Sequence, residues 1–242
     1  MTTRIYDLPT RMFHWLFAGS FLTAFTIANT IDDESTAFAW HMLAGLIMVF
    51  TVLLRIVWGF VGTKHARFSD FHLNPAALFQ YINGVFTGNN IPRAGHNPAS
   101  SWAAMLMMLL AIGLGVSGYL MASGSAGDVL EDAHELMADL FIGVVLLHLA
   151  GLVLHNLKHQ DQLSKSMLSG DKQGLDQSTL SVRSHRLLGL LFVCLTLSFG
   201  MYLQQNFAPA TGTLHLLGTT LQLSEAGEHS SNKNASEEND DD

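Results

Sequence analysis

The chain has 242 residues, of which 49% are hydrophobic and only 13% are charged. A typical soluble domain carries about 25% charged residues, so this composition argues against a soluble globular protein. The net charge of -8 gives no basic surface for DNA or RNA. A single cysteine, Cys194, excludes an intrachain disulfide and a cysteine-ligated zinc or iron–sulfur site. Any bound metal must therefore use the 12 histidines.

Five apolar segments each come close to the length that crosses a membrane. Spanning about 30 Å of hydrocarbon takes about 20 residues in a helix. The segments are apolar throughout and rich in Leu, Met and Gly, which predicts helices rather than the alternating strands of a barrel. The expected fold class is an all-α membrane protein, with a four-helix transmembrane bundle and a fifth C-terminal transmembrane helix. The predicted helices cover residues 12–29, 39–60, 102–122, 134–157 (fully apolar from 138) and 187–203.

The first apolar segment has an alternative interpretation as a secretory signal peptide. Arg4 and Arg11 precede it, and the small-residue sequence at 37–39 lies downstream. That sequence stands well beyond the apolar run and follows the acidic residues 32–34. We therefore expect the segment to be retained as the first transmembrane helix.

The basic residues are distributed asymmetrically over the predicted connections. Eleven of the 12 Lys and Arg residues fall on one side of the membrane, and the positive-inside rule makes that side cytoplasmic. This distribution places the amino terminus in the cytoplasm, and an odd number of helices then places the carboxy terminus in the periplasm. We predict a multi-pass protein of the bacterial inner membrane, in contact with lipid. The eleven residues are Arg4, Arg11, Arg55, Lys64, Arg67, Arg93, Lys158, Lys165, Lys172, Arg183 and Arg186.

Two regions are expected to lie outside the membrane. The connection from about residue 61 to 101 carries turn signals and predicts a short interfacial helix near residues 75–81. Residues 225–242 hold seven acidic side chains against Lys233 and are expected to be disordered. The predicted organisation is a four-helix domain over residues 1–175, a linker and fifth helix over 176–204, and an external tail over 205–242.

Five histidines lie in or at the edge of apolar spans, where an ionisable side chain is costly and indicates a functional site. His134 and His148 are 14 residues apart on one predicted helix, which puts both on nearly the same face and about 21 Å apart along the axis. His14 lies at the cytoplasmic depth of His148, and His41 lies at the external depth of His134. Depth therefore pairs His14 with His148 and His41 with His134, while His155 is expected to be interfacial.

Each pair would place two imidazoles opposite each other. One such pair at each of two depths is the arrangement that holds two six-coordinate haems between transmembrane helices. A single membrane histidine can instead be an interhelical hydrogen-bond partner, so the inference depends on four histidines at matched depths. A small residue also lies about one turn from each histidine, which leaves room for a flat macrocycle but is equally typical of ordinary helix packing. These residues are Ala18, Gly45, Ala138 and Gly151.

Arg55 is the one basic residue well inside a predicted span. It can snorkel to the cytoplasmic face, or its guanidinium can neutralise a haem propionate at the inner level. Cys194, in the fifth predicted helix, is expected to be a small buried hydrophobe. Histidines in the connection between the second and third helices, namely His65, His72 and His96, are assigned no function.

The chain carries a series of motifs in order: YDLPTRMFHW (6–15), His41, LRIVWGFVGTKHARFSDF (54–71), GHNPAS (95–100), HELMADL (134–140) and LLHLAG (146–151). With them the region from Tyr6 to Lys172 resembles the prokaryotic cytochrome b561 and nickel-hydrogenase b-type cytochrome family. The resemblance implies a four-helix core with two b-type haems, whose axial ligands are His14, His41, His134 and His148. It does not extend to the fifth helix or the acidic tail.

Histidine on both axial positions leaves the irons no open site, so outer-sphere one-electron transfer is the expected chemistry. The sequence predicts an electron carrier between a periplasmic c-type cytochrome or hydrogenase-like enzyme and either membrane quinone or an inner donor. The alternative is a histidine-based metal-ion transporter, which would normally place carboxylates near the midplane. These spans hold only Asp139, near the outer edge.

Overall fold

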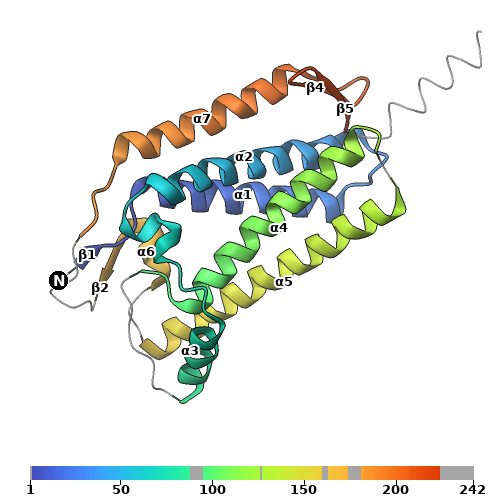
Figure 1. Cartoon of the computed structure of the whole chain (residues 1–242). Coiled ribbons are helices and arrows are strands. Elements are labelled where there is room, and N and C mark those ends of the chain that lie inside the picture. Colours follow the sequence, from blue (N-terminus) through green and yellow to red (C-terminus); the bar gives the residue numbers. More distant parts are fainter. Residues whose placement is uncertain (1, 88–94, 126, 160–162, 174–180, 224–242) are drawn as a thin grey trace, which may run out of the picture.

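In the part of the chain that the computed structural model describes, five long helices run side by side (Figure 1). The structure describes residues 2–87, 95–125, 127–159, 163–173 and 181–223. Each predicted apolar segment falls within one long helix. The long helices are α1 (Leu8–Thr30), α2 (Ala39–Val61), α4 (Pro98–Ala122), α5 (Asp128–His159) and α7 (Arg186–Gln205).

Polar caps explain why α1 and α4 begin four residues before their predicted starts. The side chain of Asp7 accepts a hydrogen bond from the backbone N–H of Thr10 at 2.9 Å. Asn97 caps α4 in the same way, accepting from the backbone N–H of Ser100 at 2.8 Å, and Pro98 is the first helical residue. These residues satisfy the free N–H groups of a first turn, which hydropathy does not detect because that turn is polar.

Within the described residues, four helical stretches are long and apolar enough to cross a membrane, which makes the chain a multi-pass membrane protein. They are Thr36–Val61, Pro98–Ala122, Asp128–Leu157 and Arg186–Gln205. This is one fewer than the five predicted. α1 has sufficient length, 23 residues, but carries polar side chains such as Thr23 and Asn29. Both donate back to the helix, to the carbonyls of Gly19 and Phe25, so their polar groups are satisfied locally.

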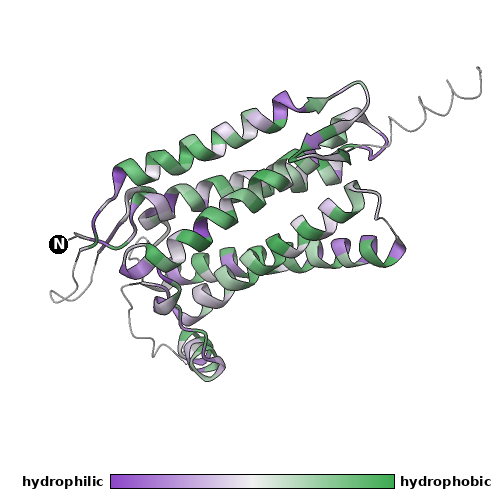
Figure 2. Cartoon of the chain, turned by 45° about the horizontal axis from the view of Figure 1, so that its top comes forward, coloured by the Kyte–Doolittle hydropathy of each residue, from purple (hydrophilic) through white to green (hydrophobic). Residues whose placement is uncertain are grey.

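The apolar residues are arranged as expected for a protein surrounded by lipid. Figure 2 shows the long helices largely hydrophobic along their length. Only 6% of the most apolar part of α5 is buried inside the protein, and large residues such as Leu147 and Leu157 are exposed. An apolar surface of this extent is stable only against lipid or another protein.

The long helices form two hairpins and an additional helix. α1 packs along α2, and α4 packs along α5, while α2 also contacts α4 and joins the two hairpins. α7 lies against α1 and α2. A buried cluster at the centre of the bundle joins Phe17, Val52, Met108 and Phe141, one residue from each helix of the two hairpins.

One end of the bundle, called here the N-terminal end, carries β1 (Thr2–Arg4), β2 (Asp171–Gln173) and α6 (Leu163–Ser169). β1 pairs with β2 in antiparallel register, and Arg4 and Asp171 form an ion pair at 3.6 Å. The indole N–H of Trp15 donates to the Met167 carbonyl at 3.1 Å. These contacts fasten the segment that follows α5 to the start of α1. The helix predicted near residues 75–81 is α3 (Pro75–Thr87), longer than expected.

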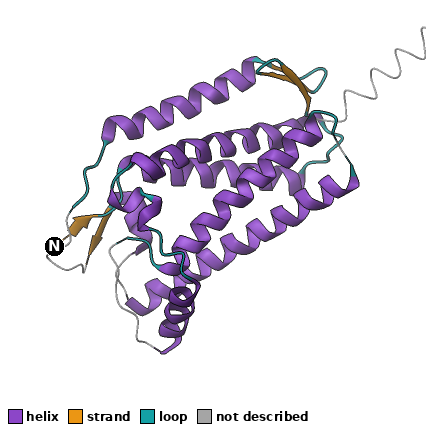
Figure 3. Cartoon of the chain, in the orientation of Figure 1, coloured by secondary structure: helices purple, strands orange, loops and turns teal. Residues whose placement is uncertain are grey.

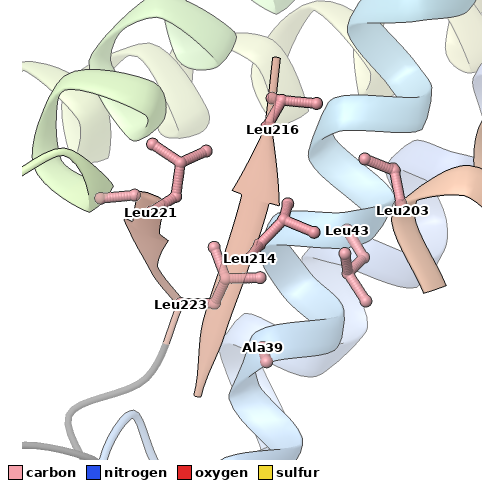
Figure 4. Packing of buried hydrophobic residues seen from close by; sticks show 8 residues of the cluster. Ala39, Leu43, Leu203, Leu214, Leu216, Leu221 and Leu223 are labelled. Atoms are coloured by element: carbon pink, nitrogen blue, oxygen red, sulfur yellow. The ribbon is translucent and has the colours of Figure 1, made fainter. Parts of the chain in front are cut away.

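The opposite end, called the meander end, holds a three-stranded antiparallel sheet (Figure 3). Its strands are β3 (Phe207–Ala208), β4 (Thr213–Leu216) and β5 (Thr219–Gln222). Leucines on β4, β5 and the residue that follows pack against Ala39 and Leu43 of α2 (Figure 4). The described chain is mostly helical, as an all-α class predicts, but residues 207–222, which were assigned to an external tail, and β1 and β2 contain strands that the sequence analysis did not predict. The predicted disordered segment, residues 225–242, lies outside the described residues.

Candidate functional site: two histidine pairs

The structure brings His41 and His134 together at the meander end. His41 lies in the first turn of α2 and His134 in the second turn of α5. Their ring centroids are 6.3 Å apart, with an angle of 65° between the planes. Both rings are half-buried, and the two side chains interact electrostatically. This is one of the two pairs that depth in the membrane predicted.

Each histidine of this pair has its Nδ1 atom engaged. His41 Nδ1 lies 2.9 Å from the carbonyl oxygen of Ala24, and His134 Nδ1 lies 2.7 Å from Ser117 Oγ. The Ser117 hydroxyl donates to backbone carbonyls of its own helix, at 3.0 Å for Gly113, so it accepts from His134. Both rings then carry hydrogen on Nδ1, which leaves each Nε2 lone pair available to a metal, the usual arrangement of metal-binding histidines.

His14 and His148 form the second pair, nearer the N-terminal end. His14 lies on α1 and His148 on α5, both half-buried, and they are close enough to interact electrostatically. His14 also makes an edge-on contact with Trp15, with ring centroids 5.2 Å apart. The structure thus places the four predicted histidines as two pairs at two levels, joined by α5.

An aromatic layer separates the two levels. Phe141 is fully buried and lies seven residues from both His134 and His148 on α5. Its ring centroid lies 4.4 Å from that of Phe21 and 5.9 Å from that of Phe17, both on α1. This apolar layer keeps water out of the space between the histidine pairs.

Two of the predicted small residues border open space. A Cβ atom added at Gly45 or at Gly151 would meet no heavy atom of another residue within 4 Å. Gly45 lies one turn from His41, and Gly151 lies three residues after His148. Ala138 instead packs against the central apolar cluster. Gly151 is exposed, so the open space there is at the surface, whereas Gly45 is half-buried beside the His41/His134 pair. The open space at Gly45 suits a flat macrocycle at the meander end, and the buried, unpaired Nη1 atom of Arg55 suits a haem propionate at the other level.

Arg55 does not reach the surface, which excludes snorkelling as its explanation. Only 3% of the residue is exposed, and its guanidinium lies over the rings of Phe68 and Phe71 at 5.1 and 5.8 Å. Its Nη1 atom is buried and has no hydrogen-bond partner among the described residues. Arg55 lies six residues before the end of α2, and His14 lies six residues after the start of α1. Both are therefore about 9 Å inside the N-terminal end.

Sequence reasoning missed the burial of two histidines in the connection before α4. His65 is 4% exposed and His96 is 9% exposed, whereas both were treated as ordinary loop residues. His65 Nδ1 lies 2.9 Å from Asp70 Oδ2. A Cβ atom at Gly95 would lie 2.5 Å from His65 Nδ1, so His96 follows a glycine that packs directly on this pair. Burial, and then the charge of Arg55, lower the pKa of His96 to about 4.

Asp7 is a second buried group that the sequence did not assign. Besides capping α1, the carboxylate accepts from Trp58 Nε1 at 3.1 Å and from Thr63 Oγ1 at 2.6 Å. It is fully buried. The carboxylate therefore ties the start of α1 to the end of α2, which fixes the helices that carry His14 and Arg55.

Cys194 is exposed on α7, not buried as predicted. Among the described residues, no group of three or more His, Cys, Asp and Glu side chains is arranged to hold a metal ion. The histidines come together as pairs.

Comparison with known proteins agrees with the resemblance seen in the sequence. The family model for prokaryotic cytochrome b561 matches residues 5–170. A "Probable Ni/Fe-hydrogenase B-type cytochrome subunit" from Rhizobium leguminosarum bv. viciae is 23% identical over 209 residues, covering 69% of this chain and 87% of the relative. A protein of the same name from Bradyrhizobium diazoefficiens is 23% identical over 219 residues, covering 72% and 87%.

A third relative is the "Probable Ni/Fe-hydrogenase 1 B-type cytochrome subunit" of Escherichia coli K12. It is 24% identical over 143 residues, covering 49% of this chain and 60% of the relative. No solved structure matches the chain. The family match includes both histidine pairs and ends before β2, so α7 and the meander lie outside it.

Proposed function

Because the chain belongs to the prokaryotic cytochrome b561 family, we propose that it is a di-haem b-type cytochrome that carries single electrons across the bacterial inner membrane. Family membership and the apolar helices establish the coarser function, haem-based electron transport by a membrane cytochrome b. We further propose that the chain binds two haems, that histidines are their axial ligands and that the electrons pass to or from the partners named below.

The observation that carries the proposal is the arrangement of four histidines in two pairs at two levels of one bundle. His14 and His148 would hold one iron, and His41 and His134 the other. Haem bound there supplies reversible one-electron chemistry. The protein's residues bind and orient it, and the Nδ1 hydrogen bonds of His41 and His134 fix the ring orientation. With histidine on both faces, substrate and oxygen have no open coordination position.

Arg55 is proposed to hold a propionate of the haem at the N-terminal level. An unpaired guanidinium in an apolar environment is strongly unfavourable, and a carboxylate beside it would compensate the charge. The depth that Arg55 shares with His14 supports this assignment.

We place the N-terminal end in the cytoplasm, with all five long helices crossing the membrane. The pairing of β1 with β2 puts the amino terminus and the basic segment after α5 at the same end, as the positive-inside assignment requires. A periplasm-specific reporter fused after Asp242 should then be active, and the same reporter fused after Lys172 should be silent. A silent fusion after Asp242 would mean that one of the five helices does not cross.

A hydrogenase is the external redox partner that the names of the relatives suggest, and a periplasmic c-type cytochrome is the second candidate. Membrane quinone, or an inner donor, would exchange electrons at the other end of the path. A quinone-linked role would make the protein a subunit of an oxidoreductase rather than an enzyme by itself.

The alternative, a histidine-based metal-ion transporter, is weakened by the geometry of the pairs. Each pair offers two imidazoles, whereas protein sites for a bare metal such as zinc use three or four ligands. Two opposed imidazoles match the two axial positions of a haem iron.

Quantification of haem in the purified full-length protein tests the proposal. A reduced-minus-oxidised absorption spectrum should show b-type haem, and the pyridine haemochrome should give two haems per chain. A value of one haem per chain would show that only one of the two proposed sites holds haem. A protein that contains no haem but binds zinc would overturn the proposal in favour of the transporter.

A further inference from the structure

Several buried nitrogen atoms near the N-terminal end have no hydrogen-bond partner among the described residues. They are Arg55 Nη1, His72 Nδ1, His96 Nδ1 and Trp102 Nε1. Buried polar atoms in folded proteins are nearly always paired, so an unpaired group indicates a missing partner. Several such nitrogens in one region indicate a partner with acceptor oxygens.

Three of these nitrogens, on Arg55, His72 and His96, belong to side chains that contact or act on one another between the end of α2 and the start of α4. The ring of Phe71 contacts both Arg55, at 5.8 Å, and His96, with centroids 4.8 Å apart. His72 follows Phe71, and its backbone N–H donates to Ser101 Oγ at 3.1 Å. Ser101 is the neighbour of Trp102 in the sequence.

The charges around His96 leave this region short of acceptors. Tyr6 makes an edge-on contact with His96, and Arg55, His65, His72 and Asp70 act on it electrostatically. Asp70 is the single acid among these groups, and it already pairs with His65 at 2.9 Å.

The other nearby acid, Asp7, acts on Arg55 but is engaged by three donors. An external carboxylate would therefore complete the region. The depth that Arg55 shares with His14 puts such a carboxylate at the edge of the N-terminal haem level.

We propose that Arg55, His72 and His96 form a carboxylate-binding site for a propionate of the haem held by His14 and His148, and that His96 exchanges a proton with the cytoplasm when that haem changes charge. This rests on the proposed function. The redox partner supplies one electron to the iron, and His96 Nδ1 takes one proton from water, so the net charge of the region is unchanged. Oxidation returns the electron to the partner and the proton to water.

Electrostatics supports the exchange. Burial, and then the charge of Arg55, lower the pKa of His96 to about 4, although Asp70 acts in the opposite direction. A carboxylate raises the pKa again, and an added electron raises it further, so protonation follows the redox state between the two values. One proton per electron changes the ratio of reduced to oxidised haem tenfold per pH unit, which is 59 mV for a one-electron couple.

Redox titration of the purified, haem-loaded full chain at several pH values tests this. The haem concerned is identified as the one missing from His148→Ala. Its midpoint potential should fall as pH rises in the wild type, and His96→Gln should abolish that slope. His215→Gln, which changes an exposed histidine on β4 at the opposite end, should keep the slope. A slope retained in His96→Gln would overturn the proposal.

The carboxylate is tested separately by loading the protein with haem or with haem dimethyl ester, in which the propionates are blocked. Wild type should bind haem at least tenfold more tightly than the ester at the N-terminal level, and Arg55→Gln should lose that preference. Arg55→Lys keeps the positive charge and should therefore keep part of the preference for haem over the ester. If the glutamine variant still prefers haem, Arg55 does not bind a propionate.

Two controls separate this inference from the proposed function. The absorption band of the haem at the meander end should be unchanged in every variant, which shows that the bundle is folded. A wild-type protein without haem would instead contradict the proposed function itself.

Discussion

The two ends of the bundle hold equivalent histidine pairs but differ in what surrounds them. At the meander end, a layer of leucines from β4 and β5 covers the first turn of α2, where His41 lies. At the N-terminal end, the groups beside the pair are polar and buried, with Asp7 and Arg55 at its centre. The same type of ligand is thus set in an apolar environment at one end and in a charged one at the other.

This difference has a consequence for the proposed electron path. A buried guanidinium stabilises the haem that carries one positive charge less, so Arg55 favours the reduced state at the N-terminal level. The meander end has no comparable cation among the described residues of its apolar cluster. We expect electrons at equilibrium to occupy the N-terminal haem preferentially, and expect only its potential to depend strongly on pH.

The largest effect should come from removing one ligand. His148→Ala should lower the haem content from two per chain to one, because the two levels share α5 but not a histidine. His41→Ala should also lose one haem, and the absorption spectrum that remains should be that of the haem lost in His148→Ala. Pyridine haemochrome quantification measures both, and full haem content in the His148 variant would exclude the assigned pairs.

The next effect concerns the anchor of the N-terminal end. Asp7→Ala leaves the backbone N–H of Thr10, the indole of Trp58 and the hydroxyl of Thr63 without their acceptor. Losing three hydrogen bonds to a buried carboxylate should cost on the order of 3 kcal/mol of unfolding free energy.

Thermal unfolding of the haem-loaded protein measures this loss. Asp171→Asn is the matched control, because its ion pair with Arg4 is 36% exposed on both sides and contributes about 0–1 kcal/mol. Equal destabilisation by both changes would show that Asp7 is not the anchor.

A comparable test at the meander end uses Leu221, which is fully buried between β5 and α2. Leu221→Ala should cost about 2–3 kcal/mol, at the lower end for a buried leucine because the site is close to the surface. Leu217→Ala, at the exposed tip of the same hairpin, should change little, since this residue is 88% exposed. If only the His41/His134 haem becomes easier to remove, the meander supports that level alone.

The sequence predicted the helices and the histidine pairs because both follow from local properties. Twenty apolar residues specify a membrane helix, and the position of a histidine within it specifies a depth. The start of α1 was placed too late because Asp7 and Pro9 act through capping, not hydropathy. The meander was overlooked although its alternating leucines and Gly218, at φ +87°, are typical of a hairpin.

The polar groups of the N-terminal end could not be found by the same reasoning. Asp7 meets Trp58 and Thr63, which are 51 and 56 residues away in the chain. His96 is buried because its connection folds back over the end of α2, and nothing in its local sequence indicates this. Contacts between distant segments decide whether a loop histidine is exposed or becomes part of a site.

The smallest expected effect concerns the orientation of His134 at the meander end. Ser117→Ala removes the oxygen that accepts from His134 Nδ1, so the ring loses the contact that fixes its tautomer and direction. Loss of such a contact lowers metal affinity about tenfold or more, or about 1.4 kcal/mol, while the axial bond itself remains. Haem at the meander end should therefore stay bound but dissociate faster to apomyoglobin, whereas haem at the N-terminal end should not. Ser123→Ala, at the residue that follows the same helix, is the control, because the Ser123 hydroxyl donates only to the Leu120 carbonyl at 2.9 Å. Equal dissociation rates in the two serine variants would mean that Ser117 does not orient a ligand, and that the two levels differ only through Arg55 and its neighbours.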